Sequence, residues 1–331
     1  MSHTVQLLQG ASFTAAEDRT LLDAALAAGL HLEHSCRTGR CGTCKTRLLS
    51  GSVKTVAADS CLSAADRQAG WVLTCADAAV GDVSLQAENL ARLAGIDART
   101  LPARLDSITH LAHDVVHVLL RLPPASPLKF LPGQYINVIG DGGLRRSYSL
   151  AEAPRADGKL ELMIRRVDDG AMSAYWFDKA KANDLLRIDG PRGSFFLRDV
   201  AGLDLRLLAT GTGIAPIRAL LTELAALPAE AQPRSVRLYW GGRVPQDLFW
   251  QPPHGIDYVP VLSRADEQWA GARGHIQDVM LASMHEQGED LSSTQVYACG
   301  SPAMIDSARF ALTGAGLPET AFFSDAFVSS D

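Results

Sequence analysis

Apolar and polar residues alternate over residues 4–15, at the start of the chain, which predicts a hairpin of two short strands. Residues 20–28 instead carry leucine and alanine at helical spacing, and Gly29 stands where a helix C-cap is expected. Residues 45–51 and 81–87 return to a strand pattern. Together these patterns predict a short sheet that grips one helix.

The middle of the chain alternates apolar and polar residues more regularly, between turns rich in Gly, Pro and Asp. The alternation holds for residues 104–123, 130–140, 145–151 and 159–167. Short alternating strands separated by such turns are typical of an antiparallel β-barrel.

The last third of the chain changes to short apolar strands separated by helices. Strands are expected at residues 204–211, 235–242, 257–264 and 294–301, with helices such as 215–226 and 302–313 between them. Strand–helix alternation predicts a parallel, doubly wound α/β sheet. Ligands of such sheets bind beyond the carboxyl ends of the strands, so the residues just after each strand are of most interest.

These three patterns predict a multidomain protein. A chain of 331 residues is too long for one compact core. We expect domains at residues 1–92, 101–200 and 203–331, with residues 93–101 as a linker.

Composition narrows the class of protein. Apolar residues make up 47% and charged residues 21%, as in ordinary globular proteins. A net charge of −6 argues against a nucleic-acid partner, which usually meets a basic face. No apolar run approaches the roughly 18 residues of a membrane span, and the first residues lack the features of an export signal. We therefore expect a cytoplasmic protein with reduced thiols.

Four cysteines have the spacing of a metal cluster site. Cys36, Cys41 and Cys44 follow the pattern C-x4-C-x2-C, and Cys75 comes after 30 further residues. Plant-type [2Fe–2S] sites have this arrangement, with three thiolates from one loop and a fourth from a distant segment. The spacing predicts that these four cysteines hold a [2Fe–2S] cluster.

The neighbouring residues fit a cluster better than the alternatives. Gly39 and Gly42 suit a tightly wrapped loop, because glycine adopts positive φ without steric cost. Disulfides are disfavoured in a cytosolic chain, zinc sites usually show two C-x2-C pairs, and a lone redox pair would leave two cysteines unexplained. Cys61 fits no ligand spacing and is expected to be a small, partly buried apolar residue. Three basic residues can offset the charge of the cluster or face an acidic partner: Arg37, Arg40 and Lys45.

Three histidines, His110, His113 and His117, lie in one strand-like stretch. Their spacing raises the alternative of a metal site. No acidic or thiol residue accompanies them at ligand spacing, so we favour histidines on a strand face or at the surface.

Several motifs resemble known redox proteins. Residues 1 to about 92 resemble the β-grasp fold of plant-type ferredoxins. Arg146-Ser147-Tyr148-Ser149 resembles the R-x-Y-S motif of the ferredoxin–NADP reductase superfamily, where it lies on a barrel strand that faces the flavin. The resemblance implies that Arg146 pairs with the FAD pyrophosphate and that Tyr148 packs along the flavin. It also implies that Ser149 forms a hydrogen bond with flavin N5, the atom that accepts hydride.

Two further fragments resemble the same superfamily in the expected order. Residues 170–173, with Gly170, Met172 and Ser173, resemble the turn that opens a helix beneath the FAD pyrophosphate. Residues 190–195 resemble the turn that closes the flavin domain. Relatives often carry Ser, Thr or Asn three residues after the motif serine, but this chain has Glu152, which is not assigned to the cofactor site.

The last domain carries two motifs for a nicotinamide nucleotide. Residues 211–216 match the G-T-G-I-A-P motif of the superfamily, in which glycines let phosphate approach the backbone. Proline in the first helical turn costs nothing, because its missing N–H would be unpaired there. Residues 299–304 resemble the C-G-x-x-x-M motif, whose cysteine lies beside nicotinamide C4. The resemblance assigns these residues to the nucleotide: Gly211, Thr212, Gly213, Pro216, Cys299, Gly300 and Met304.

The C-terminal segment holds an aromatic residue that family members place against the flavin ring. Phe323 and Phe327 are the candidates, and Phe327 is preferred. The alternative is that one of them packs on the sheet edge. Asp325 is a further candidate for polarising the hydride-transfer site near Cys299.

The choice between NADH and NADPH depends on the residues after the third strand of the last domain. Ser263 and Arg264 stand where NADPH enzymes offer a base to the 2′-phosphate. Asp266 and Glu267 follow at once and would repel a phosphate. NADH is therefore favoured.

Over the whole chain, the order of ferredoxin, FAD barrel and nicotinamide domain resembles the iron–sulfur flavoprotein reductases. Two subfamilies share this order: the CDP-6-deoxy-Δ3,4-glucoseen reductases and the reductase components of bacterial oxygenases. Residues 145–154 and 322–330 resemble the first more closely. The resemblance implies that hydride passes from the nicotinamide to FAD beside Ser149 and Cys299. Electrons then pass singly through the [2Fe–2S] cluster to a partner enzyme.

The partner implied by the resemblance is a dehydratase that works on a CDP-sugar or, alternatively, an oxygenase component. Other classes of protein are an electron carrier or redox sensor without a nicotinamide site, and an interaction scaffold. Residues 211–216 and 299–304 argue against both.

Overall fold

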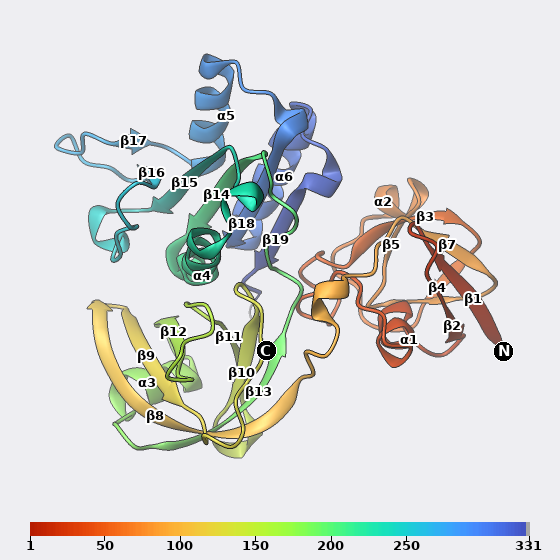
Figure 1. Ribbon diagram of the computed structural model, residues 1–331, viewed down its shortest axis with the longest axis horizontal. Coiled ribbons are helices and arrows are strands. Elements are labelled where there is room, and N and C mark those ends of the chain that lie inside the picture. Colours follow the sequence, from red (N-terminus) through yellow and green to blue (C-terminus); the bar gives the residue numbers. More distant parts are fainter. Residues whose placement is uncertain (329–331) are drawn as a thin grey trace. The chain divides into compact units, whose positions relative to one another are not determined.

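The computed structural model of the protein describes residues 1–328 and divides into two compact units, one of residues Met1–Ile96 and one that begins at Asp97. Each unit has its own sheets and apolar core (Figure 1). Among the described residues, no helix is both long and apolar enough to cross a membrane.

The first unit is a β-grasp domain. Its five-stranded sheet has the order β2-β1-β7-β3-β5, and β4 and β6 form a separate pair. The bounds are β1 Ser2–Leu7, β2 Ser12–Ala16, α1 Leu21–Ala27, β3 Lys45–Ser50, β4 Val53–Thr55, α2 Ala64–Gln68, β5 Trp71–Leu73, β6 Asp77–Ala79 and β7 Val83–Leu85. Helix α1 begins after Thr20, whose hydroxyl accepts a hydrogen bond from the backbone N–H of Asp23. Its leucines enter the core of the sheet, as the sequence pattern predicts.

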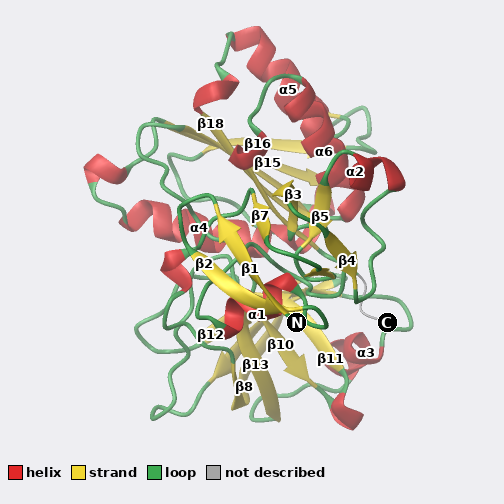
Figure 2. Ribbon diagram, turned by 90° about the vertical axis from the view of Figure 1, so that its right-hand side faces the viewer, coloured by secondary structure: helices red, strands yellow, loops and turns green. Residues whose placement is uncertain are grey.

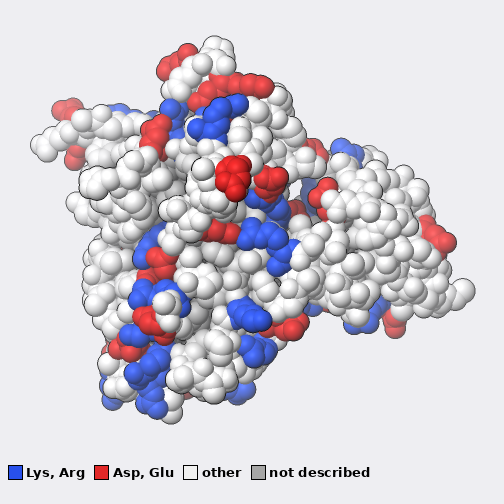
Figure 3. Space-filling view, in the orientation of Figure 1, with Lys and Arg blue, Asp and Glu red and all other residues white. Residues whose placement is uncertain are grey.

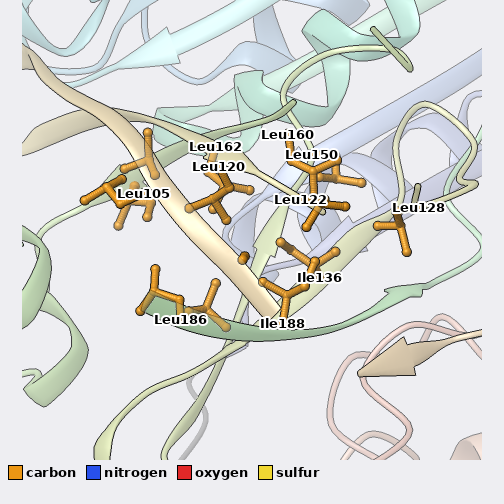
Figure 4. Packing of buried hydrophobic residues seen from close by; sticks show 14 of the residues in the cluster. Leu105, Leu120, Leu122, Leu128, Ile136, Leu150, Leu160, Leu162, Leu186 and Ile188 are labelled. Atoms are coloured by element: carbon orange, nitrogen blue, oxygen red, sulfur yellow. The ribbon is translucent and has the colours of Figure 1, made fainter. Parts of the chain in front are cut away.

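The second unit starts with a six-stranded antiparallel barrel of order β11-β10-β13-β8-β9-β12. The bounds are β8 Arg99–Ala112, β9 Val115–Arg121, β10 Tyr135–Ile139, β11 Arg145–Ser149, β12 Leu160–Arg165, α3 Ala171–Asp178 and β13 Leu185–Arg192. A bridge between Leu150 and Leu162 joins the two end strands. Leucine and isoleucine side chains from several strands fill the interior (Figure 4), and the predicted barrel is confirmed. Strand β8 begins at Arg99, inside the stretch that the sequence suggests as a linker.

The rest of the second unit is a doubly wound domain around a parallel sheet of order β17-β16-β15-β14-β18-β19. The bounds are β14 Asp204–Thr210, α4 Ile214–Ala226, β15 Ser235–Gly242, β16 Asp257–Leu262, β17 Ala272–Arg273, α5 Ile276–Gln287, β18 Thr294–Gly300, α6 Pro302–Gly314 and β19 Phe322–Ala326. Helix α4 covers one face of this sheet, and α5 and α6 cover the other (Figures 1 and 2). The α/β class is confirmed, while α5, β17 and β19 were not anticipated.

Charged residues of both signs are interspersed over the face of the molecule in Figure 3. Many of them form ion pairs within the fold, such as Arg145 with Asp189 and Arg166 with Asp178.

Candidate functional site

The four cysteines of the predicted cluster site lie on one side of the β-grasp domain. Cys36, Cys41 and Cys44 stand in the loop between α1 and β3, and Cys75 follows β5. The Cys44 thiol donates to the sulfur of Cys75, with 2.9 Å between the two Sγ atoms. The Cys41 thiol donates in the same way to Cys36, and this bond lowers the pKa of Cys36 to about 4. The fold therefore brings the four together as two pairs.

Two pairs of thiols suit a cluster of two irons. Within residues 1–328, no three His, Cys, Asp or Glu side chains converge on a point that would hold a single metal ion. Backbone N–H groups also reach the sulfurs: that of Thr38 donates to Cys36 Sγ at 3.4 Å, and that of Gly39 lowers the pKa of Cys75 after the larger effect of the Cys44 thiol. Such donors stabilise thiolates, so the residues present fit a [2Fe–2S] cluster.

The two glycines of the cluster loop differ in what they require. Gly39 has φ +71°, and a Cβ there would lie 2.0 Å from the carbonyl oxygen of Ala58. Gly42 has φ +73°, but its nearest neighbour would be Cys61 Sγ at 3.9 Å. At position 39, both the positive φ and the lack of space for a Cβ require glycine. At position 42, only the positive φ favours glycine.

Loop bases that could face an acidic partner form ion pairs inside the domain. Arg37 pairs with Asp23 at 2.5 Å, and Lys45 pairs with Asp66 at 2.5 Å. The positive charge available for docking is therefore smaller than the sequence suggests.

The predicted flavin-side residues meet where β11 approaches α3. The hydroxyl of Tyr148 accepts a hydrogen bond of 3.0 Å from Trp176 Nε1, and their rings meet edge to face at 6.1 Å. Burial raises the pKa of Tyr148 to about 12. Ser149 is buried opposite Tyr135 in the strand register, and Arg146 donates from Nη1 to the carbonyl oxygen of Arg145.

Helix α3 starts with backbone groups that fit a phosphate. Its N-cap is Gly170, which offers no side-chain cap to the N–H groups of the first turn. Met172 and Ser173 are buried in that turn, and the Ser173 hydroxyl accepts a hydrogen bond of 2.8 Å from the N–H of Val167. Uncapped N–H groups and the helix dipole favour an anion, so the residues present fit the FAD pyrophosphate.

The predicted nicotinamide-side residues meet at the carboxyl ends of β14 and β18. A Cβ at Gly213 would lie 2.2 Å from the carbonyl oxygen of Cys299. A Cβ at Gly300 would lie 2.1 Å from Thr210 Oγ1 and 3.0 Å from Met304 Cε. The two motifs, almost ninety residues apart in the sequence, are therefore pressed together at glycines that no other residue could replace.

The loop before α4 also fits a dinucleotide. Gly213 is the N-cap of α4 and provides no side-chain cap, while Thr212 precedes it and Pro216 lies in the first turn. Trp240 Nε1 donates a hydrogen bond of 3.1 Å to the carbonyl oxygen of Gly211. The loop is thus held in place. The N–H of Ile214 donates to the carbonyl oxygens of Gly211 and Thr212, and Gly213 offers no side-chain cap to the helix that follows.

Cys299 is fully buried at the end of β18. Burial, and to a lesser degree the charge of Asp325, raise the pKa of this thiol well above its usual value. Asp325 is its direct register partner on β19. Cys299 therefore remains a neutral thiol at physiological pH.

The two candidate aromatics of the C-terminal segment have different surroundings. Phe323 belongs to β19 and stacks on Tyr297, with ring centroids 4.9 Å apart. Phe327 is 39% exposed, and its backbone N–H donates to the carbonyl oxygen of Gly300 at 2.9 Å. Phe323 thus packs at the sheet edge, while Phe327 stands beside the Cys299–Gly300 turn.

Residues that the sequence left unassigned join the barrel to the nicotinamide-binding domain. Glu152 accepts a hydrogen bond of 2.9 Å from Arg218 of α4, and the same guanidinium lies 3.0 Å from Glu161. Glu161 also accepts from His117 at 3.1 Å. No pattern in the sequence marked these contacts, because they join segments far apart in the chain.

The turn after β16 places the residues that bear on cofactor choice. Ser263 and Arg264 are exposed, and the backbone N–H of Arg264 donates to the carbonyl oxygen of Arg243. The Asp266 carboxylate accepts hydrogen bonds of 3.1 Å from the N–H groups of Gln268 and Trp269. The Asp266 carboxylate is therefore engaged by the backbone of its own turn.

Three family models match successive parts of the chain. Residues 6–79 match the 2Fe-2S iron-sulfur cluster binding domain, residues 102–197 the oxidoreductase FAD-binding domain and residues 207–309 the oxidoreductase NAD-binding domain.

Similar proteins cover the whole chain. It is 41% identical over 328 residues to the CDP-6-deoxy-L-threo-D-glycero-4-hexulose-3-dehydrase reductase of Yersinia pestis, covering 97% of each chain. It is 32% identical to the terephthalate 1,2-dioxygenase reductase component 1 of Comamonas sp, covering 100% of this chain and 98% of the relative. The crystal structure of the Amycolatopsis cytochrome P450 reductase GcoB superposes with a TM-score of 0.72 at 31% identity over 99% of both chains. The chain therefore belongs to the family of NAD(P)H-dependent iron–sulfur flavoprotein reductases.

Proposed function

We propose that this reductase takes hydride from NADH and delivers single electrons to a dehydratase that acts on a CDP-linked deoxyhexulose. The observation that carries the proposal is that one chain builds a two-pair thiol site, an uncapped flavin-side helix and a glycine loop pressed against Cys299. The 41% identity to a CDP-6-deoxy-L-threo-D-glycero-4-hexulose-3-dehydrase reductase supports the choice of acceptor. Relatives among oxygenase reductase components, at 32% identity, make an oxygenase the second candidate.

When bound, FAD would accept two electrons as a hydride and release them one at a time, and the [2Fe–2S] cluster would carry single electrons. The protein residues hold these groups and set their surroundings. The proposed domains are residues 1–92 for the cluster, 101–200 for FAD and 203–331 for the nicotinamide nucleotide.

On the flavin side, the chain's own groups bind and orient. Arg146 and the uncapped N–H groups after Gly170 neutralise the pyrophosphate, with Met172 and Ser173 shaping the first turn of α3. Tyr148, held by Trp176, presents its ring to the flavin. The buried Ser149 hydroxyl would donate a hydrogen bond to flavin N5.

On the nicotinamide side, backbone groups rather than charged side chains face the proposed nucleotide. Gly211, Thr212 and Gly213 let the pyrophosphate reach the N-terminus of α4, whose first turn contains Pro216. Gly300 and Met304 form the wall behind the ring. Cys299 would lie beside nicotinamide C4 as a neutral thiol. Phe327 would cover the flavin ring in the absence of the nicotinamide.

At the cluster site, the residues that would hold the two irons are the thiol pair Cys36 and Cys41 and the thiol pair Cys44 and Cys75. Loaded cluster sites of this kind need reduced thiols, and we therefore place the protein in the cytoplasm.

The preference for NADH is supported by Asp266 and Glu267 beside Arg264. A 2′-phosphate on NADPH would meet their negative charge. The half-saturating concentrations of NADH and NADPH for flavin reduction test this preference, and a lower value for NADPH would reverse it.

The function itself is tested with purified, cofactor-loaded protein under anaerobic conditions. NADH is expected to bleach the flavin and then the cluster, and to support turnover of a CDP-6-deoxyhexulose-3-dehydrase. A terephthalate dioxygenase oxygenase component serves as the alternative acceptor. Turnover with the oxygenase alone would replace the proposed acceptor, and absence of flavin bleaching with either nucleotide would refute the reductase function.

A further inference from the structure

Strand β12 of the barrel presents one face to the nicotinamide-binding domain. Glu161, Met163 and Arg165 alternate along it and so point the same way. Glu161 lies 3.0 Å from Arg218 of α4, and Met163 is buried in the apolar core that the sheet and α4 share. Strand β12 also lies next to the Gly211–Gly213 turn. The last residue of this face, Arg165, therefore lies at the nucleotide-binding loop.

Arg165 approaches the loop at Gly211, at the place where a side chain of that residue would begin. Its Nη1 atom lies 2.9 Å from the point that a Cβ at Gly211 would occupy. Gly211 has φ +54°, and its carbonyl oxygen accepts the Trp240 hydrogen bond on the other side. The guanidinium of the flavin-binding domain therefore packs against this glycine, and the indole of the nicotinamide-binding domain is hydrogen-bonded to its carbonyl oxygen.

Arg165 also contacts the turn after β15 through Asp247. Its Nη2 atom donates a hydrogen bond of 2.8 Å to Asp247 Oδ1, in a carboxylate that is only 5% exposed. The other oxygen, Oδ2, accepts a hydrogen bond of 2.7 Å from the backbone N–H of Arg243. Asp247 thus ties the turn after β15 to the barrel.

The far side of the guanidinium is anchored within the barrel. Arg165 Nε lies 3.0 Å from Asp114 Oδ2. One arginine therefore joins a barrel carboxylate, the nucleotide loop and the turn after β15. The neighbouring Arg166 has no such reach, since it pairs with Asp178 of the barrel at 2.5 Å.

We propose that Arg165 is a positioning residue for the nicotinamide nucleotide: from the flavin-binding barrel, it sets the Gly211–Gly213 loop directly and the Arg243 turn through Asp247. The inference rests on the proposed function, because it takes that loop as the site of the dinucleotide pyrophosphate. It adds that the nucleotide site is completed by the flavin-binding domain.

The test compares two hydride donors in anaerobic stopped-flow reduction of the bound flavin. NADH carries the pyrophosphate, whereas reduced nicotinamide mononucleotide lacks the pyrophosphate bridge and the adenosine. For Arg165→Met we expect the half-saturating NADH concentration to rise about tenfold, the effect of one lost charge-assisted hydrogen bond, with an unchanged limiting rate. The rate with the mononucleotide should not change.

The partner residue supplies the decisive comparison. Asp247→Asn should raise the half-saturating NADH concentration as Arg165→Met does, and the double variant should be no worse than either one, since both remove the same link. Arg165→Lys should restore part of the affinity. Arg166→Met is the matched control and should behave as the unaltered protein. Additive effects of the two variants, an equal loss with both donors, or unchanged affinity for NADH would each overturn the inference.

Failure of the proposed function and failure of the Arg165 inference give different results. If NADH does not reduce the flavin of the unaltered protein, the proposed function fails and the inference with it. If it does, the variants decide the inference alone. Retention of FAD, measured by absorbance, distinguishes a misfolded variant from a folded variant whose nucleotide loop is displaced. If Arg165→Met does not fold, Arg165→Lys and Asp247→Asn decide the outcome.

Discussion

At the scale of single residues, Gly39 and Gly42 make a natural comparison within the cluster loop. Gly39→Ala would place a Cβ 2.0 Å from the Ala58 carbonyl oxygen in addition to the strain of a positive φ. We expect a cost of about 1–2 kcal/mol from the backbone conformation and about 1–3 kcal/mol more from the overlap. The variant should lose most of its cluster, as measured by iron content and visible absorbance.

Gly42→Ala is the matched control, because it has the same backbone strain and open space around it. It should retain most of the cluster. Equal cluster content in the two variants would show that the contact with Ala58 does not govern the loop.

Ser149 is the second residue that can be tested alone. Ser149→Ala removes one buried hydroxyl at the end of β11 and leaves the strand register unchanged. We expect flavin reduction by NADH to slow about tenfold, the effect of one hydrogen bond, with FAD still bound. An unchanged rate in stopped-flow measurements would remove Ser149 from the hydride step.

Residue roles differ in how far the sequence could reveal them. The cysteines and glycines of residues 36–44 are close together in the chain, so their spacing carries the information. Arg165 and Asp247 are 82 residues apart and belong to different domains, so no local pattern connects them. The partners of Arg37 and Lys45, which reduce the charge of the cluster loop, are likewise set by the fold.

At the scale of elements, α4 is fastened to the barrel by a buried carboxylate. Burial by itself raises the pKa of Glu161, but the hydrogen bond from His117 and the charges of Arg218 and Arg155 together lower it to about 2. Against its usual value of 4.5, the lowered pKa corresponds to about 3 kcal/mol of stability at neutral pH. This contribution is complete above about pH 4.5 and is lost as the pH falls toward 2.

Glu161→Gln should therefore lower the free energy of unfolding at pH 7, and the difference from the unaltered protein should shrink as the pH falls below 4.5. Urea unfolding followed by tryptophan fluorescence over this pH range measures the effect. A difference that does not depend on pH would mean that the charge of Glu161 does not hold α4.

Three elements of the nicotinamide-binding domain leave weak signals in the sequence, β17 and β19 because they are short and α5 because few of its residues are buried. Strand β19 is only five residues long, and it forms because Phe322–Ala326 pairs with β18. Two-residue β17 depends in the same way on β16. Helix α5 buries only four residues, Ile276, Gln277, Met280 and Met284, and its apolar stripe is therefore narrow. Short elements stabilised by distant partners leave weak periodic signals, whereas β14 and α4 are apolar enough to be predicted from sequence.

At the scale of the whole molecule, the chain separates receiving a hydride from releasing single electrons. Cys41→Ser should abolish the cluster, because one of the two thiol pairs is broken. Reduction of ferricyanide by NADH through the flavin should remain, and transfer to a partner enzyme should stop. Both rates are measured on the same preparation. Loss of the two activities together would contradict this division between domains.

The tryptophans give each domain its own optical signal. Of the five, Trp71 lies in the β-grasp domain and Trp176 in the barrel, while Trp240, Trp250 and Trp269 lie in the nicotinamide-binding domain. Trp176 is bonded to Tyr148 of the proposed flavin site, and Trp240 to Gly211 of the proposed nucleotide loop. A series of variants could each keep one tryptophan and carry phenylalanine at the other four positions. The fluorescence of each variant would then report on a single domain. One variant would follow the cluster-bearing domain, another flavin occupancy and a third arrival of the nucleotide, without any added dye.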